Sequence, residues 1–379
     1  AMGAYRANEA FKAREAAQLS KELADQEATR AEAQPRTEDL LTIDPLKIEL
    51  GYGLIALADP KQGGDLLTRI QIIRQQIATK LGFVVPVIRI VDNMRLRPNE
   101  YRVRLREAII GGYELLPEHF MAMNPGLAEE EIEGVPTKEP AFGLQATWVA
   151  RAHRDRAERL GYTIVEPTAV LATHLTELIT AHASDLLTRE DVQNLIKHLK
   201  ETSPSVVEEL LPNLLTLGEV QKILHNLLRE RVSIRNLEAI LETLADYAPR
   251  TKDLDILTEY CRHRLAREIS AQYADEGRVL HVVTLDPAVE REILDAVRQG
   301  ETGEYVPIAP NRADLIARNA AQAVQPLTLV GHEPVVLTSA PVRRYFRRMV
   351  ERRIPKIVVL SYNEIDPEVQ VQSEGQVSA

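Results

Sequence analysis

The chain has 379 residues, of which 45% are hydrophobic and 27% charged, and it carries a formal net charge of -10 and a single cysteine. This composition is typical of a folded, soluble, acidic protein, and the length predicts roughly two to four structural units rather than one core. The negative charge disfavours nucleic acid or anionic lipid as the main partner, and one cysteine excludes an intrachain disulfide.

The first segment has the composition of a solvated helix rather than of a core element. Residues 4–33 are rich in Ala, Glu, Arg, Lys and Gln and lack a wide apolar stripe. We therefore expect a helical linker over 1–44, with 1–3 as the remnant of an expression tag. We expect no signal peptide, and no apolar run reaches the roughly 20 residues that cross a bilayer.

The next segment predicts a small α/β unit. Residues 47–57 read as a strand bent at its two glycines, and apolar residues at helical spacing predict a helix over 67–81 that stops at Gly82. A buried strand is expected over 84–91. Alternating apolar and Arg residues then predict a half-exposed strand that ends at the glycines 111 and 112.

A change in composition and in predicted secondary structure indicates an inserted subdomain. An acidic loop leads to a constrained turn at Phe142, a short strand over 146–148 and a helix over 151–160. We expect the flanks of this insertion, Leu115 and a strand over 161–165, to belong to the parent sheet.

The chain becomes helical beyond Leu186. Thr188, Ser203, Thr216 and Ser233 stand where helix caps are expected, and leucines recur at helical spacing between them. These patterns predict a helical bundle.

The C-terminal part returns to α/β. A strand over 278–285, a helix from 287 to about 297, and a βαβ pattern over 335–360 predict parallel strands. Residues 300–311 read as a loop, and Val369 and Val371 suggest a final edge strand before a disordered tail.

Together these segments predict an α+β, multi-subdomain fold: a split small α/β unit with an inserted α/β subdomain, a helical bundle subdomain and a C-terminal α/β (βαβ) subdomain. The predicted boundaries are 1–44 for the linker, 45–117 with 166–187 for the first subdomain, 118–165 for the insertion, 188–268 for the helical subdomain and 269–379 for the last.

Two short blocks suggest opposite walls of one recognition cleft. Pro140 and Gly143 constrain the turn that carries Phe142, and Glu166-Pro167 opens a helix that carries Thr173. The alternative is that Phe142 is an ordinary core aromatic and Thr173 a capping or packing residue.

Other candidate chemistry is weaker. The Gly63-Gly64 loop could cradle a phosphate, but it lacks the other residues of a dinucleotide fingerprint or a P-loop and fits a flexible turn before a helix equally well. His174 and Glu177 are spaced to share a metal, but no partner ligand set is visible. We predict no catalytic residue, cofactor or metal.

Two basic clusters occur in this acidic chain. One lines a strand and its approach, and the other occupies a short helix that includes Arg343, Arg344, Arg347 and Arg348. Because exposed aromatics do not accompany them, we interpret both as solvated faces or as contacts to acidic surfaces of other proteins or neighbouring subunits, rather than as a nucleic-acid site.

The blocks in their order resemble the cytoplasmic domain of the flagellar biosynthesis protein FlhA family, the large export-gate component of type III secretion. The resemblance covers about residues 45–373. It rests on the motifs at 51–55, 64–70, 81–83, 92–93, 124–126, 140–144, 172–175 and 361–364.

The resemblance implies four subdomains and a homo-oligomeric, nonameric ring on the cytoplasmic face of the bacterial inner membrane, with 4–44 as the linker from a membrane domain that this sequence lacks. It implies a docking platform, not an enzyme, for flagellar export chaperones with bound cargo and for the export ATPase complex. The equivalent domain of a virulence injectisome is a close alternative, and a phosphate- or metal-dependent enzyme is an alternative of another class.

The resemblance also assigns site residues. The family's chaperone site is built around an Asp, a Phe and a Thr, which match Glu139, Phe142 and Thr173 here. Glu139 departs from the family's Asp by one methylene. Gly51 matches a family glycine and is expected to act as a hinge, with a bulge glycine as the equal alternative.

Overall fold

The computed structural model describes residues 43–126, 128, 130–299 and 308–378. The predicted linker and tag remnant lie almost entirely outside the described residues, as does most of the loop predicted over 300–311. No helix in the described ranges is both long and apolar enough to cross a membrane.

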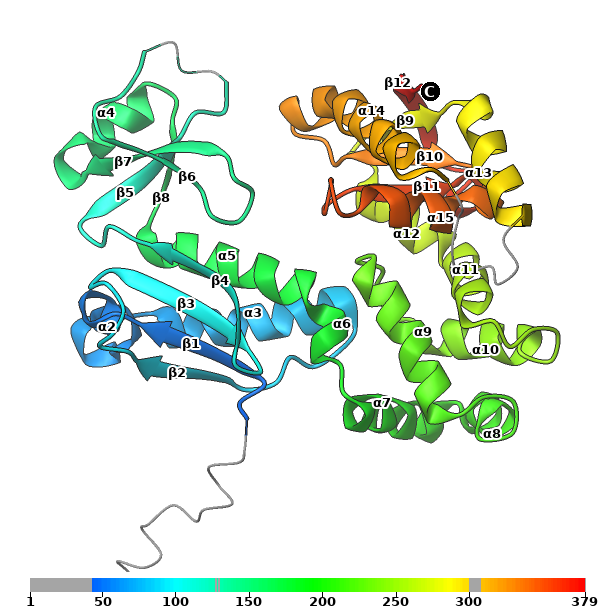
Figure 1. Cartoon of the computed structure of the whole chain (residues 1–379). Coiled ribbons are helices and arrows are strands. Elements are labelled where there is room, and N and C mark those ends of the chain that lie inside the picture. The colour runs from blue at the N-terminus through cyan, green and yellow to red at the C-terminus, as the bar shows by residue number, and fades with distance from the viewer. Residues whose placement is uncertain (1–42, 127, 129, 300–307, 379) are drawn as a thin grey trace, which may run out of the picture. The chain divides into compact units, whose positions relative to one another are not determined.

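Figure 1 shows the helices and strands of the chain, coloured by residue number. The chain divides into two compact units. Among the described residues, the first unit comprises those up to Tyr52 together with Val87–Glu114, and the second comprises Gly53–Pro86 together with those from Leu115 onward. The four predicted subdomain boundaries stay a prediction.

The first unit is built on a four-stranded sheet in the order β2-β1-β3-β4. Its strands are β1 (Leu46–Leu50), β2 (Ile88–Asp92), β3 (Glu100–Leu105) and β4 (Ala108–Glu114). β1 pairs parallel to β2 and antiparallel to β3, and alternate residues of β3 are buried. This alternation is the signature of a sheet with one covered face.

Three strand predictions in this region were wrong. The strand expected over 47–57 ends at Leu50, and the chain continues as a 3-10 helix (Tyr52–Leu54) and α2 (Ile55–Ala58). The reason is a close approach at Gly51, whose N–H donates to the Glu100 carbonyl at 2.8 Å. A Cβ there would lie 2.1 Å from the Arg97 carbonyl oxygen.

The other two errors have simple causes. The strand expected over 84–91 begins only at Ile88. Pro86 has no N–H to donate a hydrogen bond to a neighbouring strand, and Val84 and Val87 are exposed. The strand expected to reach the glycines 111 and 112 is a hairpin, β3–β4, which turns at Arg106 and Glu107, both with positive φ.

The second unit begins with two helices that pack against each other, α3 (Leu66–Leu81) and α5 (Pro167–Ala181). The predicted apolar stripe of α3 is largely buried, and Gly82 ends the helix in the left-handed conformation. Glu166 and Pro167 open α5 as expected.

The inserted segment forms a second sheet in the order β6-β7-β5-β8. Its elements are β5 (His119–Met123), β6 (Val135–Lys138), β7 (Gln145–Ala150), α4 (Arg154–Arg159) and β8 (Thr163–Val165). The expectation that 161–165 belongs to the parent sheet was wrong, because β8 pairs with β5.

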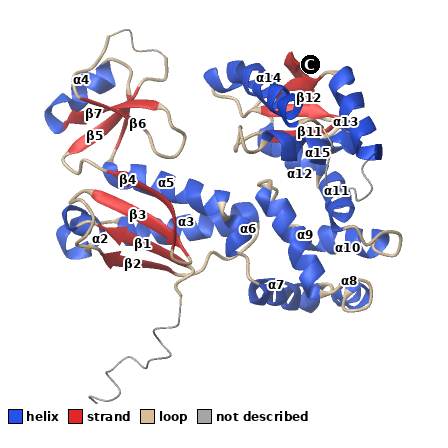
Figure 2. Ribbon diagram, viewed as in Figure 1, coloured by secondary structure: helices blue, strands red, loops and turns tan. Residues whose placement is uncertain are grey.

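Helices alone fill the chain between α5 and β9 (Figure 2). They are α6 (Ala183–Leu186), α7 (Arg189–Thr202), α8 (Pro204–Leu210), α9 (Leu217–Arg229), α10 (Leu237–Tyr247), α11 (Leu254–Arg264) and α12 (Ala266–Tyr273). Thr188 and Thr216 form capping boxes, as their sequences predict. Ser233 is not a cap, because α10 begins after Asn236.

The C-terminal sheet has the order β11-β10-β9-β12, and its paired strands are parallel. Its elements are β9 (Val279–Leu285), α13 (Pro287–Gln299), α14 (Pro310–Leu329), β10 (Val335–Thr338), α15 (Ala340–Val350), β11 (Val358–Ser361) and β12 (Gln370–Val377). The sequence reasoning missed α14. The edge strand is confirmed, but it runs to Val377, where a disordered tail was expected.

The interpretation of the basic helix α15 as a solvated face was wrong for two of its residues. Arg343 is 1% exposed and Arg347 is 8% exposed. Arg343 donates to Glu230 at 2.6 Å and to Glu259 at 2.7 Å, so carboxylates of the helical segment within the same unit compensate its charge.

The close approach at Gly51 yields a stability prediction. Gly51→Ala is expected to lower the free energy of unfolding by at least about 2 kcal/mol, because the added methyl would overlap backbone oxygens that cannot move independently. The measurement is urea unfolding. The control is Gly375→Ala, where the nearest atom to the new Cβ lies 4.0 Å away; equal effects of the two substitutions would contradict the prediction.

Candidate functional site

Phe142 lies at the tip of the hairpin between β6 and β7. The Glu139 N–H donates to the Leu144 carbonyl at 2.8 Å, and the Gly143 N–H donates back to the Glu139 carbonyl at 2.9 Å. Gly143 has a φ of 72°, which a residue with a Cβ rarely adopts. The Phe142 side chain remains 56% exposed on this tight turn, so it is not a core aromatic.

Glu139 organises this turn. Its side chain is buried, and its carboxylate accepts hydrogen bonds from the Ala141 N–H at 2.8 Å and from the Phe142 N–H at 2.7 Å. The longer Glu side chain therefore reaches both amides of the turn. Its contacts are with the hairpin itself, and its part in partner binding stays a prediction.

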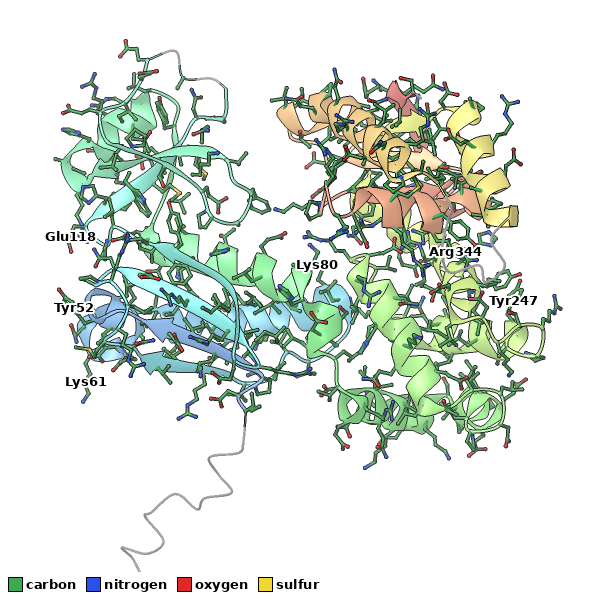
Figure 3. The ribbon with its side chains drawn as sticks, viewed as in Figure 1. Tyr52, Lys61, Lys80, Glu118, Tyr247 and Arg344 are labelled. Atoms are coloured by element: carbon green, nitrogen blue, oxygen red, sulfur yellow. The ribbon has the colours of Figure 1, made fainter. Side chains whose placement is uncertain are left out.

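Phe142 and Thr173 line one cavity of about 430 Å³ within the second unit. Thr173 is exposed on α5, and Lys80, labelled in Figure 3, contributes from the end of α3. The structure thus brings together two of the three predicted site residues. Glu139 does not line the cavity but holds the turn that presents Phe142.

Lys356 contacts both walls of this cavity. Its Nζ donates to the Ala141 carbonyl at 2.8 Å, lies 4.5 Å from the centre of the Phe142 ring, and lies 3.4 Å from a Glu177 carboxylate oxygen. Sequence reasoning missed this residue, because no motif links it to a turn so far away in the chain. The contacts place a cation over the exposed aromatic face.

Glu177 is held between two cations. Arg231 donates to it at 2.6 Å, and Lys356 approaches from the other side. Burial alone would raise the pKa of Glu177, but the hydrogen bond and charge of Arg231, together with Lys356, lower it. Glu177 is therefore an ionised, paired carboxylate.

His174 is buried on α5 beside this pair. Burial lowers its pKa to about 4, with Lys356 acting in the same direction and Glu177 opposing it. The imidazole is consequently neutral near pH 7. Within the described part of the chain, no group of three or more His, Cys, Asp or Glu side chains is arranged to hold a metal ion.

The Gly63-Gly64 loop is folded onto itself. The Gly63 N–H donates to the Pro60 carbonyl at 3.2 Å, and the Gly64 N–H donates to the Asp59 carbonyl at 3.0 Å. These amides are therefore not free to cradle a phosphate, and the loop fits the alternative of a turn that leads into a helix.

Comparison with known proteins places this architecture in a family. The FHIPEP family matches residues 1–370. The chain belongs to the FHIPEP family. It is 49% identical over 338 residues to the flagellar biosynthesis protein FlhA of Bacillus subtilis, a match that covers 89% of this chain and 50% of that protein. The chain thus spans about half the length of the curated relatives it matches.

Two solved structures share the fold of this chain. The CdsV protein of Chlamydia pneumoniae superposes with a TM-score of 0.81 at 28% identity, covering 91% of this chain and 100% of that one. CdsV has also been solved in complex with CdsO. The nonameric EscV cytosolic domain from the type III secretion system superposes with a TM-score of 0.71 at 24% identity, covering 89% of this chain and 97% of that one.

These findings confirm the resemblance and the α+β fold class. The chain is related to the cytoplasmic domains of flagellar and type III secretion export-gate proteins, a family that is not known for enzymatic activity.

The contacts of Glu139 predict its effect on stability. Glu139→Ala is expected to lower the free energy of unfolding by about 2–3 kcal/mol, because two turn amides lose a charged acceptor. Urea unfolding measures this loss. Glu133→Ala removes an exposed carboxylate close by in the chain and serves as the control; a difference of less than about 0.5 kcal/mol between the two variants would refute the role assigned to Glu139.

The burial of His174 predicts a pH dependence. Its pKa falls from 6.5 to about 4 on folding, so between these values the unfolded chain binds a proton that the folded chain does not. The stability of the protein should therefore fall as the pH is lowered from 6.5 to about 4, and His174 should account for about 1–3 kcal/mol of that loss.

Unfolding of wild type and His174→Gln across this pH range isolates the contribution, because the Gln side chain does not titrate. The variant should show a shallower pH dependence than wild type. His198→Gln, at an exposed position, should leave the slope unchanged. Parallel curves for wild type and His174→Gln would exclude the mechanism.

Proposed function

We propose that this chain is a docking platform of the flagellar type III export gate, which receives export chaperones with their bound cargo. One observation carries the proposal: an exposed Phe142 is fixed on a rigid turn at a cavity of about 430 Å³ that Thr173 also lines. A cavity of this size accommodates side chains of a protein partner, and buried aromatic anchors dominate the energy of many interfaces.

Each site residue has a distinct part in this docking. Phe142 offers apolar burial, and Thr173 offers a methyl group and a hydroxyl on α5. Glu139 acts through the turn by fixing the backbone amide of Phe142. This division of roles rests on the match to the family motif and on the contacts described above.

We also propose that Gly51 acts as a hinge. The alternative is a bulge glycine, and the carbonyl oxygens close to Gly51 already require a residue without a Cβ there. A hinge would use the same freedom of the glycine backbone.

We infer the partners from the family. The solved complex of CdsV with CdsO supports a protein partner for this chain, and we propose that this partner belongs to the export ATPase complex. We also propose a nonameric ring on the cytoplasmic face of the bacterial inner membrane, with no enzymatic activity of its own. The 49% identity to a flagellar relative, against 28% to CdsV, favours flagellar export over an injectisome.

The decisive experiment is calorimetric titration of a purified flagellar export chaperone, with and without its cargo, into the chain and into Phe142→Ala. Wild type is expected to bind with micromolar or tighter affinity. Phe142→Ala should weaken binding at least about tenfold, or about 1.4 kcal/mol, because the exposed ring is the main apolar anchor. Leu329→Ala removes a 77% exposed apolar side chain elsewhere and should not change affinity.

Two outcomes contradict the proposal in different ways. Tight binding that is indifferent to Phe142 leaves the platform in place but moves the site elsewhere. Absence of binding by a demonstrably folded chain contradicts the platform itself.

A further inference from the structure

A small, strongly charged cavity lies among α9, α11 and α15, on elements other than those that carry Phe142 and Thr173. Its volume is about 90 Å³. Five guanidinium groups and four carboxylates line it, together with Asn226 and Thr258. Arg344, labelled in Figure 3, is one of the five. The lining therefore carries one more positive than negative charge.

The carboxylates of this lining are already engaged. Glu230 and Glu259 both accept hydrogen bonds from Arg343, and Glu230 also lies 3.3 Å from Arg262. Asp255 accepts a hydrogen bond from Arg348 at 2.5 Å. These pairs neutralise Arg343 and Arg348 within the protein.

Two of the remaining guanidinium groups, those of Arg347 and Arg229, are poorly compensated. Arg347 is 8% exposed, yet its Nη1 has no hydrogen-bond partner, and the carboxylate of Glu351 lies 3.7 Å away. Arg344 is partly compensated, because it donates a hydrogen bond to the Tyr345 hydroxyl at 2.6 Å and lies 3.8 Å from Asp253 and 3.9 Å from Asp255. Arg229 is exposed and makes no ion pair with any described residue.

Leaving a buried guanidinium N–H unsatisfied is costly, and like charges increase the cost. Burial lowers the pKa of Arg347, and Arg343 and Arg262 act in the same direction against the attraction of Glu230 and Glu351. A negative ligand in the cavity would relieve both the missing hydrogen bond and the repulsion.

We propose that this cavity binds a small, doubly charged tetrahedral oxyanion, with Arg347 as the buried donor and Arg229 and Arg344 at the rim. Guanidinium groups match the oxygens of phosphate with paired donors. A volume of about 90 Å³ holds several waters or one such anion, whereas drug-sized ligands occupy about 300 Å³ or more. The ligand is therefore inorganic phosphate or the terminal phosphate of a larger molecule.

The test is calorimetric titration of the chain with sodium phosphate at constant ionic strength, with sodium chloride as the reference salt and ADP as the second ligand. Phosphate is expected to bind to wild type at millimolar or lower concentration. Arg347→Met and Arg229→Gln should each weaken binding at least tenfold. Arg159→Gln, which removes an exposed Arg on α4, should leave binding unchanged.

Every outcome bears on the proposal. Binding of ADP that is tighter than that of phosphate, and lost in the same variants, identifies a phosphate group on a larger molecule as the ligand. If Arg347→Met fails to fold, Arg229→Gln still decides, because Arg229 is exposed and unpaired. Absence of a phosphate response in wild type, or a response that Arg229→Gln and Arg159→Gln retain equally, overturns the site.

Discussion

The guanidinium of Arg343 is fully buried and hydrogen-bonds to Glu230 and Glu259, two carboxylates of the helical segment. Glu230 also pairs with Arg262, which in turn hydrogen-bonds to Glu364 after β11. Removing one partner of such a network leaves a buried charge unpaired, which costs about 3–5 kcal/mol. The network therefore fixes the helices to the C-terminal sheet within the second unit.

The stabilisation by this network depends on pH. Burial alone would raise the pKa of Glu230, but Arg343 and Arg262 outweigh burial and lower the pKa to about 2. The stabilisation is therefore present above about pH 4.5 and is lost as the pH falls towards 2.

A buried charged group also holds the Phe142 turn, namely the carboxylate of Glu139. Both carboxylate oxygens of Glu139 accept hydrogen bonds from backbone N–H groups of the turn. Lys356 adds a hydrogen bond to the Ala141 carbonyl from a distant part of the chain. An exposed aromatic side chain is not held in place by packing in a core, so the backbone that carries it must be fixed. The buried polar contacts of Glu139 with the turn fix that backbone.

Local signals predicted those parts of the fold that local contacts determine. The stripe of α3, the caps at Thr188 and Thr216 and the proline start of α5 are each decided within a few residues, and the structure bears them out. Gly51 ends its strand because of carbonyl groups that come from a distant loop, and the sequence pattern around it does not contain them. The same holds for the site: the Phe142 turn was visible in Pro140 and Gly143, whereas Lys356 became part of it only through folding.

The basic helix α15 shows why composition alone could not identify a charged site. Its arginines are evident in the sequence, but their partners come from α9, α11 and the loops beside them. Once those partners are assigned, Arg343 and Arg348 are compensated while Arg347 retains a buried N–H without an acceptor. The distinction between a structural ion network and a binding site thus depends on counting acceptors for each buried donor. An anion that supplies the missing acceptor would meet a surplus of positive charge among residues whose own ion pairs are already formed.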